Sequence, residues 1–233
     1  MSRFICLAFL GCIGAGLIYA CSPRQFTTVT IYDTPAAYVR LEFDRTVTKG
    51  REHSHPISLT PEQIAAVLGG VKVDEPIALV RGDILQGNPV PRVHPAFTDK
   101  EIELFAPLLA LALSKAMPEE VVTFYETRDL SATSREVTSG GVFVQGEELH
   151  LILANYRSHT HFMADFGVAE TQDDRLTPMQ SLAPQGGRLD FEPDSAKGER
   201  PVGGLGKIFQ WNHRDLAVRY KQLPPRPLVQ PAP

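Results

Sequence analysis

The chain has 233 residues, 43% of them hydrophobic, and a formal net charge of −4 at pH 7. Its basic and acidic residues are interspersed, which excludes a nucleic-acid partner because phosphate binding needs clustered Lys and Arg. The only cysteines are Cys6, Cys12 and Cys21. A disulfide framework, a cysteine metal site and a thiol nucleophile are therefore excluded after residue 21.

The first 21 residues have the pattern of an export signal. Arg3 supplies a positive charge, and residues 4–20 form an uncharged apolar run. The run ends in Leu17–Cys21, which resembles the lipobox of a bacterial lipoprotein signal peptide. The resemblance implies cleavage before Cys21, lipidation of that cysteine and a lipid-anchored place in the cell envelope. Ser22 further implies the outer membrane, facing the periplasm, in preference to the inner membrane.

Two alternatives to the lipoprotein signal remain open. The apolar run of residues 4–20 reaches the lower limit of about 17 residues for a transmembrane helix, so it could be an uncleaved membrane anchor. It could also be an ordinary secretory signal peptide. All three interpretations place the rest of the chain outside the cytoplasm.

Residues 21–25 are expected to form a lipidated tether, and residues 26–223 a single domain. Alternating apolar and charged residues in Tyr38–Phe43 predict a half-buried strand. A turn at Asp33–Pro35 joins it to the β-branched segment Phe26–Tyr32. The sequence therefore predicts a β-hairpin at the start of the domain.

Two segments, 60–70 and 98–116, begin with the Thr-x-x-Gln or Thr-x-x-Glu pattern of a capping box. The first has Pro61 at its first helical position and ends at Gly69-Gly70. The second carries an apolar stripe at helical spacing. Pro107 lies inside that stripe and predicts a kink or two abutting helices.

The remaining pattern is mostly β. Residues 141–145 and 149–153 alternate on either side of a short loop at 146–148, which predicts a hairpin. Further strands are expected at residues 71–73, 77–80, 121–125, 188–191, 208–211 and 216–220. Together these elements predict an α+β fold, a mostly antiparallel sheet with two helices packed on it.

Two stretches lack a regular pattern. Residues 164–207 are rich in Gly, Pro, Asp, Gln and Ser, and a segment of this length is either functional or disordered. We expect it to contact a partner, which could be another envelope protein. Residues 224–233 are rich in proline and are expected to form a disordered tail.

A second resemblance concerns the domain itself. Tyr38–Glu42, His55-Pro56, Leu59–Gln63 and the second helix are similar to the corresponding parts of uncharacterised bacterial envelope lipoproteins. This resemblance implies a location and no mechanism.

Histidines are the strongest candidates for chemistry. His53 with His55, and His159 with His161, form two His-x-His pairs. Because alternate residues of a strand share a face, each pair could present two imidazoles to one zinc or copper ion. His94, His150, His213 or Asp165 could complete the ligand set. The alternative is that these are polar histidines of loops and strand surfaces.

Hydrolytic chemistry has less support. The chain contains neither a Gly-x-Ser-x-Gly elbow nor a Ser-x-x-Lys motif. Ser139, between Thr138 and Gly140-Gly141, could be an exposed serine in a glycine turn or the entry to a hairpin. The preferred hypothesis is therefore a non-enzymatic, lipid-anchored envelope protein with a binding or assembly role. A metal-binding protein using the His-x-His pairs is the alternative, and a cryptic hydrolase is third.

Overall fold

The structure is a computed structural model that describes residues 28–75, 93–131, 134–161, 174–183, 186–198 and 214–228. Within these ranges it is an α+β fold with two α-helices and nine strands, and every strand pair is antiparallel. The fold class expected from the sequence is confirmed. The signal, Cys21, the strands expected at 77–80 and 208–211, and the candidate ligands His213 and Asp165 lie outside the described residues.

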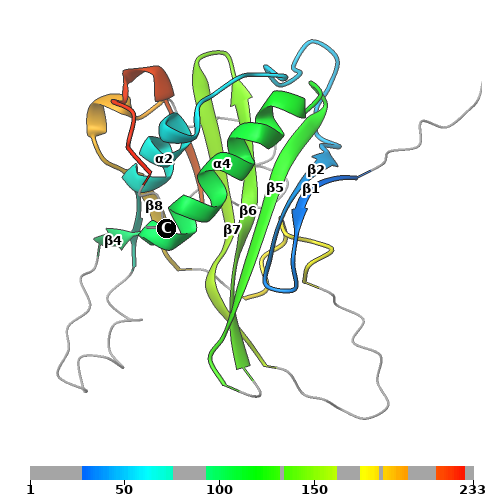
Figure 1. Ribbon diagram of the computed structural model, residues 1–233, viewed down its shortest axis with the longest axis vertical. Coiled ribbons are helices and arrows are strands. Elements are labelled where there is room, and N and C mark those ends of the chain that lie inside the picture. The colour runs from blue at the N-terminus through cyan, green and yellow to red at the C-terminus, as the bar shows by residue number, and fades with distance from the viewer. Residues whose placement is uncertain are drawn as a thin grey trace, which may run out of the picture.

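A six-stranded antiparallel sheet forms the centre of the fold, in the order β1-β2-β5-β6-β7-β9. Its strands are β1 (Val29–Asp33), β2 (Ala37–Phe43), β5 (Glu120–Asp129), β6 (Ser134–Gln145), β7 (Glu148–His161) and β9 (Asp215–Val218). Both predicted hairpins, β1 with β2 and β6 with β7, are present. Strands β6 and β7 extend far beyond the predicted arms and carry the sheet past the helices (Figure 1).

A smaller antiparallel sheet has the order β4-β3-β8. Its strands are β4 (Val93–Pro95), β3 (Val71–Asp74) and β8 (Arg188–Phe191). Short 3₁₀ turns follow at Asp194–Ala196 and Tyr220–Gln222. The expected strands at 71–73 and 188–191 are therefore present and pair with each other.

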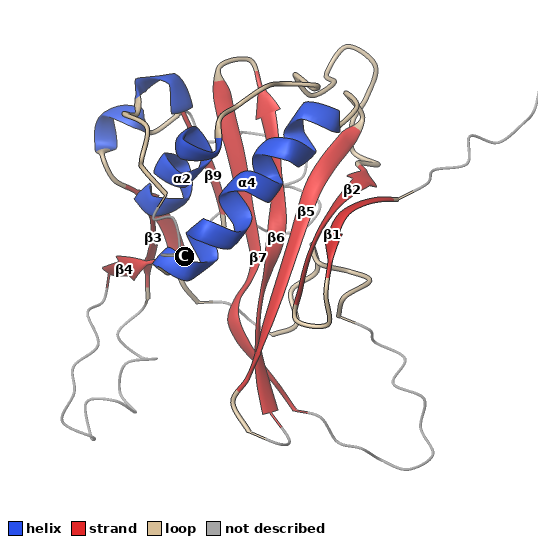
Figure 2. Cartoon of the chain, in the orientation of Figure 1, coloured by secondary structure: helices blue, strands red, loops and turns tan. Residues whose placement is uncertain are grey.

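The two helices, α2 (Pro61–Gly70) and α4 (Asp99–Lys115), lie together over one face of the large sheet (Figure 2). Each begins with the predicted capping box, in which a threonine side chain and a side chain three residues later satisfy backbone N–H groups. Pro107 lies inside α4, which is one helix and not two. Pro107 and Glu103, whose carbonyl would have accepted the missing N–H bond, are both solvent-exposed, so water can satisfy that carbonyl.

The main core lies between the helices and the sheet. Phe105 of α4 packs on Phe124 of β5 with ring centroids 5.5 Å apart, and both rings are almost completely buried. Burial of a side chain of this size contributes about 1.5–3 kcal/mol to stability. The same core takes alternate residues of the central strands, so the helix-facing set is Val39, Leu41, Val122, Phe124, Val142, Val144, Leu149, Leu151 and Leu153.

The opposite face of the sheet is covered by residues 174–183. Met179 packs on a cluster formed by Val121, Phe143, Ile152 and Ala154. The Ser139 hydroxyl donates to the Pro178 carbonyl (2.7 Å), and the Asn155 amide donates to the Gln180 carbonyl (2.7 Å). Part of the irregular segment 164–207 is therefore an intramolecular layer, and residues 188–191 of it form β8.

The start of the expected tail also packs on the domain. The Arg226 N–H donates to the Glu62 carbonyl (3.0 Å), and the Arg226 guanidinium lies 2.7 Å from the Asp99 carboxylate. Leu228 packs against the main core. Residues 224–228 are thus held across the starts of α2 and α4 and are not a free tail. None of the helices in the described ranges has the length and hydropathy that a membrane crossing requires.

Candidate functional site

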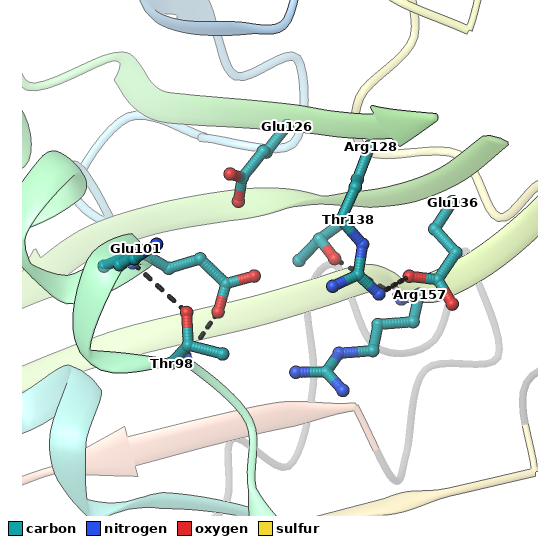
Figure 3. A pocket seen from close by; sticks show the side chains of 8 residues that line it. Thr98, Glu101, Glu126, Arg128, Glu136, Thr138 and Arg157 are labelled. Atoms are coloured by element: carbon teal, nitrogen blue, oxygen red, sulfur yellow. Dashed lines mark hydrogen bonds and ion pairs between the residues drawn. The ribbon is translucent and has the colours of Figure 1, made fainter. Parts of the chain in front are cut away.

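A pocket of about 260 Å³ lies where the start of α4 meets the helix-facing side of β5, β6 and β7 (Figure 3). Every side chain that lines it is charged or is a threonine. The lining residues are Thr98, Lys100, Glu101, Glu126, Arg128, Glu136, Thr138 and Arg157. Such a lining suits a polar ligand, because every side chain in it carries a charged or hydrogen-bonding group.

Two carboxyl groups face each other on one side of the pocket. Glu101 comes from the first turn of α4, where its Oε2 accepts a hydrogen bond from the Thr98 N–H (2.5 Å), and Glu126 comes from β5. Figure 3 shows the two side chains extending toward one another. The Glu126 Oε2 atom is buried, and no N–H or O–H group of the described residues donates to it. Burial, and then the charge of Glu101 and a hydrogen bond between the two carboxyl groups that needs a shared proton, raise the pKa of the Glu126 carboxyl to about 7.

The other acidic residue of the pocket is neutralised by bases. Arg128 forms an ion pair with Glu136, and the His159 Nε2 atom lies 3.4 Å from the other Glu136 oxygen. His159 therefore lies at the margin of the pocket, on the exposed side of Glu136. Its side chain is 62% exposed, so it is accessible to a ligand that enters there.

Arg157 supplies an uncompensated positive charge. Its guanidinium lies 5.4 Å from the centroid of the Tyr156 ring, and no carboxylate of the described residues lies within ion-pair distance of it. Its backbone N–H donates to the Thr138 hydroxyl (3.4 Å). Figure 3 shows the side chain reaching into the same open space as Glu101.

The backbone explains why Arg157 points into the pocket. The β6–β7 ladder passes from Val137–Ser158 to Ser139–Asn155, so β7 has one more residue than β6 at this place, which is a β-bulge. Arg157 lies in this bulge with φ = 44°, a left-handed conformation that is costly for a residue with a side chain. The bulge interrupts the alternation of β7 and places the side chain of Arg157 on the pocket side.

A second polar cluster, formed by Tyr156, His94 and Glu75, lies next to the pocket. The Tyr156 hydroxyl lies 3.2 Å from His94 Nδ1, and His94 Nε2 lies 3.7 Å from a Glu75 oxygen. Burial raises the pKa of the Tyr156 phenol, while the nearby Arg157 charge lowers it in part. His94, a candidate metal ligand in the sequence, is thus engaged by Tyr156 and Glu75.

His53 and His55 are buried structural residues of the loop before α2. The Ser54 N–H donates to the Val144 carbonyl (2.7 Å), and the Val144 N–H donates to His55 Nε2 (3.1 Å). The loop thereby continues the sheet beside β6, beyond Val122–Val142, where the pairing of β5 with β6 ends. His53 Nε2 lies 3.1 Å from the Asp44 carboxylate.

His150 joins this group from β7. The ring of Phe143 contacts the imidazoles of His53 and His150, with its centroid 4.3 Å from that of His53 and 4.7 Å from that of His150. Burial lowers the pKa values of His55 and His150 to about 4. Both imidazoles are thus packed against one phenyl ring in a buried place, which gives them a structural role.

The two His-x-His pairs lie at opposite ends of β6 and β7. His55 contacts Val144, whereas His159 pairs with Glu136, which is 144 − 136 = 8 residues away on β6. At about 3.3 Å per residue, the pairs are separated by roughly 25 Å. They cannot form one four-histidine site, and the described residues hold no group of three or more His, Asp or Glu placed to bind a metal.

Ser139 is not an exposed serine. It lies in the middle of β6, is completely buried, and its hydroxyl is shared by the Asn155 amide and the Pro178 carbonyl. The glycines that follow it do not form a turn. This environment offers no base and no access for a substrate, so Ser139 has a structural role.

The pocket residues were not identified from the sequence. Glu101 was interpreted as a helix cap, and Glu126, Arg128 and Arg157 were not singled out. One signal was present on β5, where the helix-facing positions change from apolar at Phe124 to acidic at Glu126. Arg157 gave no signal, because its orientation depends on the bulge.

Comparisons with protein-family models, curated proteins and solved structures found no match to this chain. The chemistry of the site therefore follows from its own geometry.

Proposed function

We propose that this protein is a non-enzymatic, lipid-anchored envelope protein whose domain binds a small polar ligand in the pocket between α4 and the sheet. The anchor is the lipidated Cys21, and the location is the outer membrane, facing the periplasm. The lipobox-like segment Leu17–Cys21 and Ser22 support this part of the proposal.

One observation carries the binding function, namely the charges that the pocket leaves unpaired. Glu126 has a buried oxygen without a hydrogen-bond partner, and the Arg157 guanidinium has no carboxylate partner among the described residues. Buried polar atoms of a folded protein are nearly always satisfied, so the buried Glu126 oxygen without a partner favours a bound ligand, and the half-buried Arg157 offers that ligand a positive charge.

Native intact-mass spectrometry of the full-length protein, extracted from the membranes of an expressing bacterium, tests both parts. The anchor predicts the mass of residues 21–233 plus a diacylglyceryl group and an acyl chain. The pocket predicts an additional small molecule that is lost on collisional activation. The Cys21→Ser variant should lose the lipid mass, and the Arg157→Gln variant should lose the small molecule while keeping the lipid.

The two readouts are independent. A mass equal to all 233 residues without lipid would exclude the lipoprotein anchor. A lipidated protein with no bound molecule, or one whose bound molecule survives Arg157→Gln, would exclude the pocket as the functional site. Arg188→Gln is the matched control, because Arg188 is an exposed arginine on β8, outside the pocket.

A further inference from the structure

We propose that the pocket binds a small zwitterion, a molecule with an ammonium group and a carboxylate, such as an amino acid or a short peptide. This inference rests on the proposed function, because it names the ligand class of the same pocket. The pocket holds acidic groups without a basic partner on one side and an arginine without a carboxylate partner on the other.

The acidic side fits an ammonium group. The carboxyl groups of Glu101 and Glu126 approach each other from α4 and β5, and neither forms an ion pair with a base of the described residues. An ammonium group has three N–H donors and can bridge two carboxylates. It would also remove the repulsion between them, which the protein alone relieves only by holding a proton on the pair.

The basic side fits a carboxylate. Arg157 projects from the β7 bulge, and its guanidinium is a planar fork that matches the two oxygens of a carboxylate. Arg128 is unsuited to this role because it already pairs with Glu136. Lys100 adds a second positive charge from the first turn of α4.

The pocket does not neutralise itself. Arg157 lies near enough to act on the Glu126 charge, yet the two groups are not within ion-pair distance. A ligand that carries both charges can pair with both groups at once. A ligand with one charge leaves one of them unpaired, so the geometry selects for the zwitterion.

Isothermal titration calorimetry of the purified protein at pH 6 tests this selection. The zwitterionic probes are glycine, 4-aminobutanoate and 6-aminohexanoate, which differ in the spacing of their charges. Butylamine and butanoate each carry one charge of 4-aminobutanoate. We expect at least one zwitterion to bind about tenfold or more tightly than either single-charge probe, because it forms two charge-assisted contacts.

Proton linkage gives a second readout. The ammonium group favours the ionised form of Glu126, which retains its proton in the free protein at pH 6. Titrations in two buffers of different ionisation enthalpy should therefore show the release of up to about one proton per bound zwitterion. The release should disappear at pH 8.5, where Glu126 is already ionised.

Three variants separate the two contacts. Glu126→Gln should abolish proton release and weaken the binding of the zwitterion and of butylamine alike. Arg157→Gln should lower the affinity for the zwitterion to that for butylamine and leave butylamine unchanged, and Arg157→Lys should restore part of the loss. Glu103→Gln is the control, because Glu103 is an exposed glutamate of α4 that does not line the pocket. Circular dichroism verifies that each variant is folded.

Several results would overturn the zwitterion. One is that none of the three zwitterions binds at millimolar concentration. Another is that butanoate binds with the same affinity as 4-aminobutanoate. The third is that binding at pH 6 releases no proton. A retained small molecule without an ammonium group, found in the membrane-extracted protein, would also overturn it while leaving the proposed function intact. The proposed binding function itself fails if the pocket retains no molecule, or if the retained molecule survives Arg157→Gln.

Discussion

At the scale of single residues, the buried histidines make the domain sensitive to acid. His55 and His150 have pKa values near 4 in the folded state because burial disfavours the imidazolium. In the unfolded chain a histidine titrates near 6.5, so the unfolded state binds more protons below that pH. The stability that these residues contribute is complete above about pH 6.5 and falls as the pH decreases toward 4.

The substitution His150→Phe should reduce this acid sensitivity. Phenylalanine keeps a ring parallel to Phe143, as His150 has now, and cannot be protonated. The loss of unfolding free energy between pH 7 and pH 4 should shrink by on the order of 3 kcal/mol, which corresponds to the pKa difference of His150 between the two states. Urea denaturation at both pH values measures this difference.

His159→Gln is the control for that measurement. The His159 side chain is mostly exposed and lies 3.4 Å from a Glu136 oxygen, so its replacement should change the loss of stability between pH 7 and pH 4 by less than about 1 kcal/mol. An unaltered pH dependence in His150→Phe would show that His150 is not excluded from protonation in the folded domain.

Sequence patterns predict local roles such as helix capping well, but they do not predict which residues meet in the pocket. The Thr98 and Glu101 capping box is visible in the sequence because it depends on residues three apart. That Glu101 also faces Glu126 depends on where α4 crosses the sheet, which no local pattern contains. The same reason applies to His53 and His55, whose spacing is compatible with a metal site and whose burial beside β6 is not encoded locally.

At the scale of elements, the long hairpin of β6 and β7 depends on a close backbone approach at Gly140. A Cβ atom at Gly140 would lie 2.0 Å from the Ile152 carbonyl oxygen. A Cβ atom at Gly141 would instead meet the end of the flexible Met179 side chain at 2.7 Å. The two glycines are neighbours in sequence, but only the first is constrained by backbone atoms.

Gly140→Ala should therefore destabilise the domain more than Gly141→Ala. Overpacking of a rigid site costs about 1–3 kcal/mol, and the Ile152 carbonyl can move only with the β7 backbone. Met179 can change rotamer to accommodate a methyl group added at position 141, which costs less. Thermal unfolding of both variants measures which one loses more stability. Equal losses would mean that the Ile152 carbonyl is no more rigid an obstacle than the Met179 side chain.

Element identity followed from the sequence, while element length and the bulge did not. The alternation at 141–145 and 149–153 predicted a hairpin, and β6 and β7 extend well beyond it. The extended arms include polar residues and glycines, whose strand conformation depends on pairing with neighbours and on the cover of residues 174–183. Such partners are distant in sequence, so their effect is absent from a local pattern.

At the scale of the whole molecule, the domain has three layers, with helices on one face of the sheet and residues 174–183 on the other. A buried ion pair joins this last layer to the sheet, because Arg135 of β6 donates two hydrogen bonds to the Asp174 carboxylate (2.8 and 2.9 Å). The Tyr125 hydroxyl donates to the same carboxylate (3.2 Å). Asp174 is therefore a buried polar attachment of the third layer.

Asp174→Asn should lower the unfolding free energy by about 2 kcal/mol or more, since it leaves the Arg135 charge with a weakened partner in a buried place. Asp33→Asn is the control for exposure, because Asp33 also forms ion pairs with arginine but is 40% exposed. Asp33→Asn should lower the unfolding free energy by less than about 1 kcal/mol. Chemical denaturation of the two variants measures the losses, and similar small losses would show that burial of the Arg135–Asp174 pair adds nothing to its contribution to stability.

The small sheet has a consequence for the order in which the chain folds. β3 begins at Val71, and its neighbour β8 begins only at Arg188. A chain that emerges from a ribosome or a translocation channel with its N-terminus first exposes β3 long before β8 arrives, and such non-local pairing is slow to form. A nascent chain that stops short of Arg188 would therefore keep one edge of β3 open for pairing with other chains, so complete synthesis is a condition for a protected fold.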